Sequence, residues 1–298
     1  MNGLSEVYRN QVRPGIVAFT LKYHPVASPD APPPVFPHII GTGFVIREDG
    51  LIATNAHVVH AIKTAPRPPD APRTEWPANV LALWLTDRGM IEVPLEILGV
   101  IEISKFEAGS VDYFNKQSPD VAFVRVKAKK LPALVLDTQT RLYEGSDVCT
   151  AGFPMGTSAL TAPGWVQQMT PTLQKGIVSA VLPFDSEHPI AYSINVMVQG
   201  GASGSPVFLP ESGEVIGILH SRLYEKVLVQ NDKIALVYSM PTNISFVCPS
   251  PYIANMLSQI PDKIPLPDLP TDTQSIDEML AGGELVDATK EPRRWAVK

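Results

Sequence analysis

The chain has 298 residues, of which 45% are hydrophobic, so it is long enough to bury the core of one large domain or two smaller ones. Its net charge of −6 combines scattered residues of both signs, and the longest basic run is "KAKK" at 127–130, which argues against a nucleic-acid-binding surface. The sequence contains no apolar run near the roughly 18 residues that a membrane-spanning helix needs, so no membrane span is expected.

Strand-like segments follow one another along most of the chain. Each is rich in Val, Ile, Phe and Tyr, and glycine, proline or polar turns bound it. Helical patterns are few, namely "SEVYRNQV", "AHVVHAIK" and "PSPYIANMLSQI". This distribution favours an all-β barrel or sandwich. In chain order, the expected strands lie in "GIVAFTLKY", "GTGFVIRE", "LIATNAHVV", "VLALWLTD", "DVAFVRVKA", "SDVCTAGFP", "QKGIVSAVL", "SINVMVQG", "SPVFLP", "EVIGILHS" and "IALVYSMPT".

The C-terminal part has a different character. Proline accounts for 30 residues of the chain, and one of its clusters, at 260–272, separates this part from the rest. Ser275 and Glu278 have the spacing of a helix capping box, but two glycines limit the helix to two turns. We expect residues 259–298 to form a linker or docking segment.

The cellular compartment is predicted from cysteine usage and from the first residues. Two cysteines, Cys149 and Cys248, are fewer than disulfide-stapled secreted domains use. The start of the sequence, "MNGLSEVYRNQVRPG", has no apolar stretch of the kind found in secretory signals. On these grounds we expect a cytoplasmic protein.

A loop with two serines, together with a histidine and an aspartate elsewhere in the chain, provides the residue types of a site for nucleophilic catalysis. Ser203 and Ser205 lie in "GGASGSPVF", where glycines permit a tight loop. A serine hydroxyl is a weak nucleophile that needs an imidazole as base and a third group to orient the imidazole. His57 follows two strand-like segments at the small-residue corner "TNAH", which favours a place beside a groove. Asp120 opens the strand "DVAFVRV", where it either receives an imidazole N–H or simply begins the strand.

These stretches resemble the trypsin-like (chymotrypsin-fold) serine proteases, especially the bacterial Deg-type and glutamyl-endopeptidase-type proteases. The resemblance runs over roughly residues 15–258 and implies two six-stranded antiparallel β-barrels, an active site in the cleft between them and a short C-terminal helix. It places a first barrel within 1–130 and a second within 131–258. The stretches that carry the resemblance are "GTGFVI", "LIATNAHVV", "SPDVAFVRV", "AGFPMG", "KGIVSAV", "GGASGSPVF" and "GEVIGILHS".

The resemblance also implies the roles of individual residues. Ser203 is the expected nucleophile, because Ser205 falls on the family's variable position. His57 is the expected general base, and Asp120 orients it. The N–H groups of Gly201 and Ser203 are expected to form the oxyanion hole. The implied function is a serine endopeptidase that hydrolyses peptide bonds of proteins or peptides through an acyl-enzyme, without a metal or organic cofactor. Because an uncontrolled protease inside a cell is hazardous, we also expect regulation, either by an activator or regulatory protein partner, by a conformational switch or by a narrow specificity.

The substrate pocket is expected between the segment before the nucleophile and the segment 219–222. Neither contains a carboxylate, which argues against a preference for Lys or Arg, since an unpaired buried charge is costly. Two preferences stay open, one for an apolar or small side chain and one for an acidic side chain attracted by arginine and protonated histidine. The histidine is otherwise a half-buried structural residue. The expected substrate-binding residues are Met197, Val198, Leu219, His220, Ser221 and Arg222.

Two further features bear on activation, and other functions fit less well. Ala202 stands where digestive relatives carry the acid used in zymogen activation, so that switch is not expected. The loop 157–174 is predicted to be mobile and regulatory, and its Trp165 and Met169 either dock on a partner or simply pack on the barrel. An α/β-hydrolase nucleophile elbow needs a glycine where Ser205 stands, and a metal site at His57 and His60 lacks further ligands. The serious alternative is a protease-fold binding module whose triad is dormant until a partner activates it.

Overall fold

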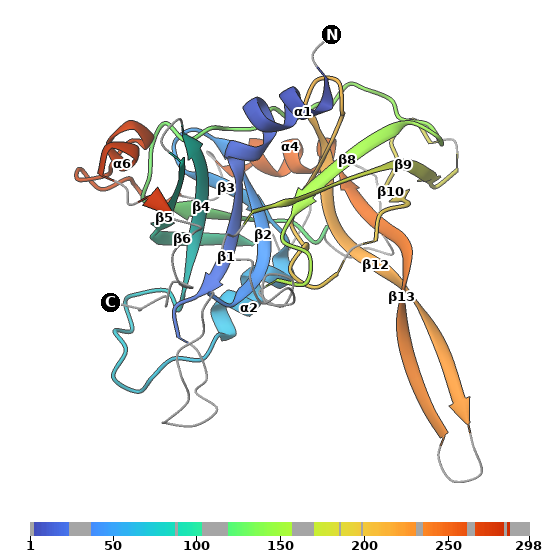
Figure 1. Cartoon of the computed structure of the whole chain (residues 1–298), viewed down its shortest axis with the longest axis horizontal. Coiled ribbons are helices and arrows are strands. Elements are labelled where there is room, and N and C mark those ends of the chain that lie inside the picture. Colours follow the sequence, from blue (N-terminus) through green and yellow to red (C-terminus); the bar gives the residue numbers. More distant parts are fainter. Residues whose placement is uncertain are drawn as a thin grey trace.

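The computed structural model shows a mostly β fold with one closed six-stranded barrel and one eight-stranded sheet (Figure 1). The all-β class predicted from the sequence is therefore confirmed. None of the helices within the described ranges is long and apolar enough to cross a membrane. The structure describes residues 3–23, 37–86, 89–102, 119–156, 170–184, 186–197, 199–230, 235–260, 266–282 and 285–286.

The eight-stranded sheet contains the N-terminal half of the strands and one strand from the C-terminal segment. Its strand order is β14-β5-β4-β1-β2-β3-β7-β6, and all its pairs are antiparallel. Strands β4 and β6 also touch although they are not neighbours in this order, so the sheet curls around its core. Its strands are β1 (Ile16–Leu21), β2 (Ile39–Arg47), β3 (Leu51–Thr54), β4 (Ala78–Thr86), β5 (Gly89–Leu95), β6 (Ile97–Glu102), β7 (Ala122–Val126) and β14 (Leu285–Val286).

The closed barrel follows in the chain and has the order β10-β13-β12-β11-β8-β9. Its strands β12 and β13 pair from the barrel out to Gln230 and Ala235, and Figure 1 shows them projecting as a long ribbon. These two strands are much longer than the short ones expected from the sequence. The barrel strands are β8 (Asp147–Gly152), β9 (Thr172–Leu182), β10 (Ala191–Ile194), β11 (Pro206–Phe208), β12 (Val215–Gln230) and β13 (Ala235–Pro249).

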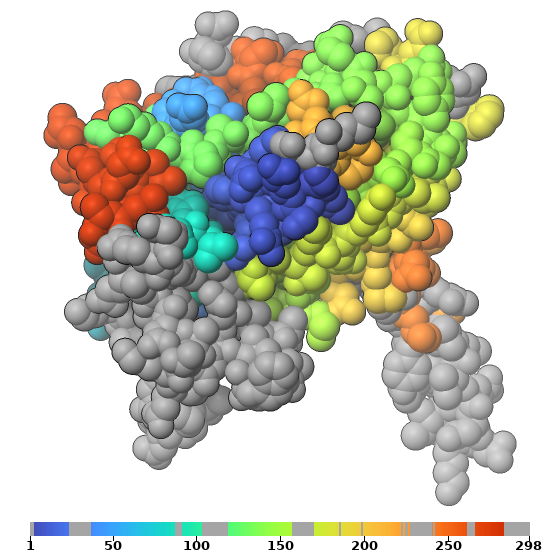
Figure 2. Space-filling model, turned by 45° about the horizontal axis from the view of Figure 1, so that its top comes forward, coloured from blue at the N-terminus to red at the C-terminus, as the bar shows by residue number. Residues whose placement is uncertain are grey.

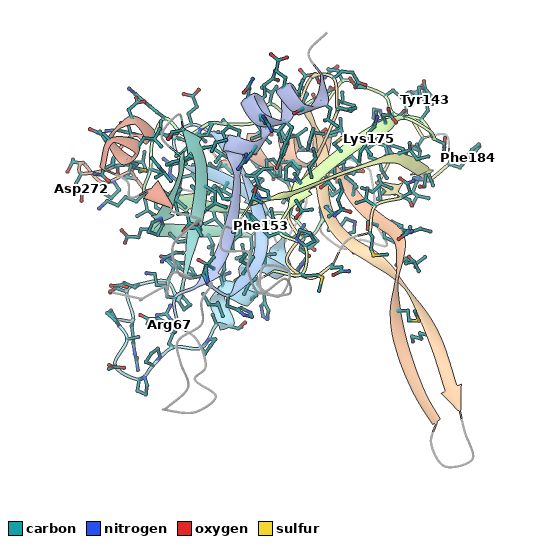
Figure 3. The ribbon with its side chains drawn as sticks, viewed as in Figure 1. Arg67, Tyr143, Phe153, Lys175, Phe184 and Asp272 are labelled. Carbon is teal, nitrogen blue, oxygen red and sulfur yellow. The ribbon has the colours of Figure 1, made fainter. Side chains whose placement is uncertain are left out.

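Helices form where the sequence predicted them. The N-terminal helical segment lies at the surface between the two sheets, in blue in Figure 2. Its Tyr8 ring stacks on Phe208 of β11, and both belong to an apolar cluster shared by the two sheets. Phe153 belongs to the same cluster and lies where the sheets meet (Figure 3). The helices are α1 (Leu4–Val7), the π-helix Tyr8–Val12, the 3-10 helix Arg13–Gly15, α2 (Ala56–Thr64), α4 (Ser250–Ser258) and α6 (Ile276–Gly282).

The described part of the C-terminal segment packs on the eight-stranded sheet. Helix α6 places Met279 in the core on that side, and β14 pairs with β5. Asp272 forms an ion pair with Lys127 and lies at the opposite side of the molecule from Phe184 (Figure 3). The first sheet therefore differs from the six-stranded barrel expected from the sequence, because it contains eight strands, one of them β14 from the C-terminal segment at its edge. The domain boundaries at 130 and 258 stay a prediction.

Candidate active site

The corner between β3 and α2 is tied to the segment before β7. Asn55 has an extended backbone, with φ −85° and ψ 152°, and its carbonyl accepts the N–H groups that begin α2. Its fully buried side chain does not cap the helix. Instead, Nδ2 of Asn55 donates a hydrogen bond of 2.7 Å to the Asp120 carbonyl. This contact holds the start of α2, and hence His57, against the chain that carries Asp120.

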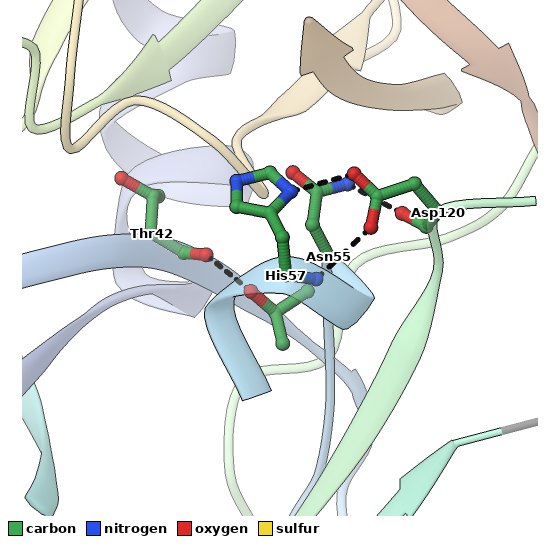
Figure 4. A network of polar contacts seen from close by, with 5 residues as sticks. Thr42, Asn55, His57 and Asp120 are labelled. Atoms are coloured by element: carbon green, nitrogen blue, oxygen red, sulfur yellow. Dashed lines mark hydrogen bonds and ion pairs between the residues drawn. The ribbon is translucent and has the colours of Figure 1, made fainter. Parts of the chain in front are cut away.

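His57 and Asp120 contact each other at two points (Figure 4). The backbone N–H of His57 donates to Oδ1 of Asp120 at 3.0 Å, and its ring Nδ1 lies 2.6 Å from Oδ2. An ionised carboxylate only accepts hydrogen bonds, so a neutral His57 carries its proton on Nδ1 and keeps Nε2 as an acceptor. The two contacts together fix both the tautomer and the orientation of the ring.

The electrostatics of Asp120 favour its ionised form. Burial acts to raise the pKa of this carboxyl, but the hydrogen bonds from His57 and the positive charges that His57 and His220 carry when protonated outweigh burial. The pKa of Asp120 is therefore below its ordinary value. A carboxylate that stays ionised beside Nδ1 stabilises a protonated His57, which is the state a general base passes through.

Thr42 of β2 anchors the loop that carries Ser203. Its N–H donates to the Ser203 carbonyl at 2.8 Å, and its Oγ1 donates to the Gly201 carbonyl at 2.7 Å. The same Oγ1 accepts the N–H of Phe153 at 3.1 Å. The carbonyl of Thr42 in turn accepts the hydroxyl of Thr54, the last residue of β3 (Figure 4). Ser203 is thus joined through two hydrogen bonds to the strand that leads to His57.

Two glycines give the loop its shape. Gly201 and Gly204 have φ of +91° and +87°, in the left-handed region that side-chain-bearing residues rarely adopt. A Cβ on Gly204 would also overlap the carbonyl oxygen of Thr42. Among the described residues, the N–H groups of Gly201 and Ser203 have no hydrogen-bond acceptor. Within the described part of the chain, two backbone donors of this loop are therefore not used in holding the fold.

The two serines of the loop differ in environment. Ser205 is 1% exposed, and its hydroxyl donates to the Ala202 carbonyl at 2.6 Å. Ser203 is half-buried, and within the described residues its hydroxyl has no hydrogen-bond partner, His57 included. The Ser205 hydroxyl is therefore used in holding the loop, whereas the Ser203 hydroxyl has no such role within the described residues.

The residues expected to bind substrate have mixed positions. Met197 is 43% exposed, and Ser221 is exposed. Leu219 is completely buried in the barrel core, and its backbone pairs with Gly204 and Ser205, so it supports the loop that carries Ser203 and exposes no side chain at the surface. Val198, the side chain of Arg222 and residues 157–169 of the predicted regulatory loop lie outside the described residues.

His220 differs from a structural histidine whose two ring nitrogens both have hydrogen-bond partners. It is half-buried, and its Nε2 is buried with no hydrogen-bond partner among the described residues. Burial lowers the pKa of His220, the Asp120 charge acts in the opposite direction, and the His57 charge lowers it further.

Thr42 and Asn55 are the site residues that sequence reasoning missed. Both are completely buried polar residues, and both lie inside stretches that carry the family resemblance, "GTGF" and "TNAH". A polar residue in an otherwise apolar buried strand needs a hydrogen-bond partner, and that requirement is the signal that marks Thr42. The partner itself is 159 positions away, so the sequence cannot identify it.

Comparison with known proteins gives a family for this fold and site. The sequence profile of the trypsin-like peptidase domain matches residues 41–218. The chain belongs to this family. The matched region includes the candidate-site residues of both sheets, from Thr42 in β2 to Ile218 in β12. The predicted resemblance to trypsin-like serine proteases is confirmed.

Relatives of this trypsin-like peptidase domain carry the name "probable periplasmic serine endoprotease DegP-like". The protein from Halomonas elongata is 28% identical over 209 residues, which cover 69% of this chain and 33% of the relative. That from Hahella chejuensis is 30% identical over 189 residues, covering 62% of this chain and 30% of the relative. The match thus spans about a third of the relatives' length. A solved HtrA-type protease with a tripeptide shares 16% identity, covers 88% of this chain and 64% of its own, and gives a TM-score of 0.48.

The relatives confirm the Deg-type part of the resemblance and contradict the predicted location. The relatives from Halomonas elongata and Hahella chejuensis are both named periplasmic, so the expectation of a cytoplasmic protein is wrong. That expectation rested on the two cysteines and on the composition of the first residues. A low cysteine count cannot distinguish the compartments, because a protein held together by an apolar core needs no disulfide in either one.

Proposed function

We propose that this trypsin-like peptidase domain is a serine endopeptidase that uses Ser203, His57 and Asp120 as its catalytic triad. The observation that carries the proposal is the two-point contact between His57 and Asp120, together with a Ser203 hydroxyl that is not used in holding its loop. The family membership supports the reaction class, and the names of the relatives support a periplasmic site of action.

The proposed reaction has two halves. Ser203 Oγ bonds to the carbonyl carbon of the scissile peptide while its proton passes to Nε2 of His57, and Asp120 stabilises the resulting imidazolium. The C–N bond then breaks, and the leaving amine takes the proton from Nε2. A water molecule attacks the acyl-enzyme in the same way, with His57 again as base, and releases the carboxylic acid and free Ser203.

The oxyanion that forms in each half is assigned to the N–H groups of Gly201 and Ser203. Their lack of acceptors among the described residues and the left-handed backbone of Gly201 support this role. Preorganised donors of this kind contribute about 2.7–4 kcal/mol each to transition-state stabilisation.

We place the substrate in a cleft between the two sheets. The proposal is supported by the origin of the residues, since His57 and Asp120 come from the eight-stranded sheet and Ser203 precedes β11 of the barrel. Thr42 bridges the two sides by its contacts with Ser203 and Gly201. The site is completed when substrate binds, because bonds between a nucleophile and its base often form fully only in the substrate complex.

The proposed substrates are proteins and peptides with an apolar or small side chain before the cut. The described wall residues offer no carboxylate for a basic side chain, and Met197 exposes an apolar group. A positional peptide library tests this preference. Cleavage after Asp or Glu would instead indicate that Arg222 attracts an acidic substrate side chain. Cleavage after Lys or Arg would contradict both the apolar or small preference and the acidic one.

The proposed triad is tested by steady-state hydrolysis of an unfolded protein substrate. Ser203→Ala and His57→Ala should each lower kcat/KM by about 10⁴-fold or more, because triad members act as a unit. Ser205→Ala is the matched control and should keep most of the activity. An inactive Ser205→Ala beside an active Ser203→Ala would contradict the assignment.

A further inference from the structure

Strands β12 and β13 continue beyond the closed barrel as a two-stranded ribbon (Figure 1). In this ribbon, residues 224–230 of β12 pair with residues 235–241 of β13. At about 3.4 Å per residue, the paired segments extend over about 20 Å. The neighbouring strands β11 and β10 pair with them only within the barrel, at residues 215–218 and 245–247. Within the described residues, the two outer edges of the ribbon therefore pair with no further strand.

The free edges of the ribbon have few of the features that protect an exposed strand. Its sequence contains the apolar runs "VLV" at 227–229 and "ALVY" at 235–238, and its only charged residues are Glu225 and Lys226. A two-stranded ribbon outside a core is only marginally stable in water, and its edge presents a row of unpaired backbone groups. Such an edge binds another extended backbone as an added strand.

Exposed apolar side chains occur on the ribbon and at its base. Met240 in the ribbon is 53% exposed, and Leu223 and Ile244 at the base are 43% and 36% exposed. The hydroxyl of Thr242 donates to the Leu223 carbonyl at 3.0 Å, which ties the strands together where their regular pairing is interrupted. Exposed apolar groups gathered on a projecting element indicate an interaction surface.

The base of the ribbon lies beside the proposed substrate wall. The Ser245 hydroxyl of β13 donates to the Val196 carbonyl at 2.7 Å, and Met197 of the wall follows directly in the chain. On the other strand, the ribbon continues the wall segment 219–222 without a break in β12. A polypeptide held along the ribbon would therefore have one end beside the loop that carries Ser203.

We propose that this ribbon is an accessory binding site for an extended segment of an unfolded polypeptide substrate, which adds to one edge of the ribbon as a third strand. The inference rests on the proposed function and adds a second contact with the substrate, away from the cut. An unfolded polypeptide has free backbone groups along its length, whereas a folded protein has most of its own paired. Continuity with the substrate wall favours a substrate over a second copy of this chain, because an interface between copies needs no path to the nucleophile.

The test compares cleavage of two matched peptides. One spans only the cleavage site, and the other is lengthened on either side by a tail of alternating valine and threonine. In the wild type, the tail should raise kcat/KM by about tenfold, because the ribbon holds the peptide near the site. The same tail with proline at every second position lacks backbone donors and should give little gain.

Variants of the ribbon should lose the gain that the tail provides. Joining Leu223 to Thr242 through an Asn-Gly turn removes the whole ribbon. The double substitution Leu223→Ser and Met240→Ser gives the same comparison in a chain of full length. Leu85→Ser, which removes an equally exposed apolar side chain from β4 of the other sheet, is the matched control and should keep the gain.

Binding of the tail alone to Ser203→Ala, measured by fluorescence anisotropy, separates this proposal from the proposed function. The tail should bind that variant and bind more weakly when the ribbon is also removed. Equal gains from the tail and its proline form, or a gain that survives both ribbon variants, would overturn the proposal while Ser203→Ala stays inactive. Wild-type oligomers that dissociate on removal of the ribbon, with the gain unchanged, would overturn it in favour of a contact between copies. If Ser203→Ala itself retains activity, the proposed function fails instead.

Discussion

At the scale of single residues, Thr42 connects the two halves of the site. Its hydroxyl donates to the Gly201 carbonyl and accepts the Phe153 N–H, and its backbone N–H binds the Ser203 carbonyl. The residue is completely buried, so water cannot replace these contacts if the hydroxyl is lost. A threonine in an early strand therefore determines the geometry of a loop that lies much later in the chain.

Replacing Thr42 by valine should affect both stability and activity. Thr42→Val keeps the shape of the side chain but leaves the Gly201 carbonyl and the Phe153 N–H without a partner, which costs about 1–3 kcal/mol. We expect that loss in the free energy of unfolding by urea and a parallel fall in kcat/KM. Thr42→Ser keeps the hydroxyl and is the control. A valine variant with wild-type activity and stability would show that the loop does not depend on this contact.

Asp120 gives the folded protein a pH dependence with a predictable direction. Its pKa is lowered in the folded state, so it contributes stability above its unfolded pKa of about 3.9 and loses that contribution as the pH falls through the folded value. In Asp120→Asn the free energy of unfolding should therefore decline less steeply below about pH 4. Urea unfolding at a series of pH values measures this slope.

The matched control is Asp70→Asn, which removes an exposed carboxylate from the loop between α2 and β4. Its slope should follow the wild type. An Asp120→Asn slope equal to the wild type would mean that the contact with His57 does not stabilise the fold.

At the scale of elements, the docked C-terminal segment depends on the start of α6. The carboxylate of Glu278 accepts the N–H of Ser275 at 2.6 Å and its hydroxyl at 2.9 Å, while the N–H of Glu278 donates back to the hydroxyl at 3.4 Å. This is the capping box predicted from the sequence. It positions α6 so that Met279 enters the core of the eight-stranded sheet.

Removing the cap should loosen this segment. Ser275→Ala is expected to lower the free energy of unfolding by about 1 kcal/mol, and Ser275→Thr should recover most of it because the hydroxyl remains. Hydrogen exchange should show the loss concentrated in α6 and in the β14–β5 pair. Wild-type exchange in that region of Ser275→Ala would indicate that packing alone holds the segment.

Elements made by local patterns could be predicted from the sequence, and those made by distant pairing could not. The capping box, α2 and the strand before it depend on residues within a few positions of one another. The pairing of β14 with β5, at Leu285 and Ile91, joins segments that carry no common pattern. The same holds for the candidate site. The order of His57 and Asp120 in the sequence fits the family and could be predicted, whereas the contacts of Thr42 arise only in the folded chain and could not.

At the scale of the whole molecule, the N-terminal segment holds the two sheets together. The Tyr8 ring stacks on Phe208 with centroids 6.5 Å apart, and its hydroxyl donates to the Pro171 carbonyl at 3.3 Å. The apolar cluster around it contains Phe44 and Phe123 from one sheet and Phe208 from the other. A core shared in this way predicts a single cooperative unfolding transition.

Truncating Tyr8 tests that shared core. Tyr8→Ala should lower the free energy of unfolding by about 3 kcal/mol, and Tyr8→Phe, which keeps the ring, should lower it by about 1 kcal/mol. Calorimetry reports both the loss and the cooperativity. A Tyr8→Ala variant as stable as Tyr8→Phe would show that the stack does not couple the sheets.

Ser203 is proposed to be an activated nucleophile, and labelling with a fluorophosphonate tests this role most directly. The reagent forms a covalent bond only with a serine whose proton is removed by a nearby base, and mass mapping of the digested protein locates the label. We predict labelling of the wild type at Ser203, unchanged labelling of Ser205→Ala and none of Ser203→Ala or His57→Ala. A label on Ser205, or an unlabelled wild type, would contradict the account.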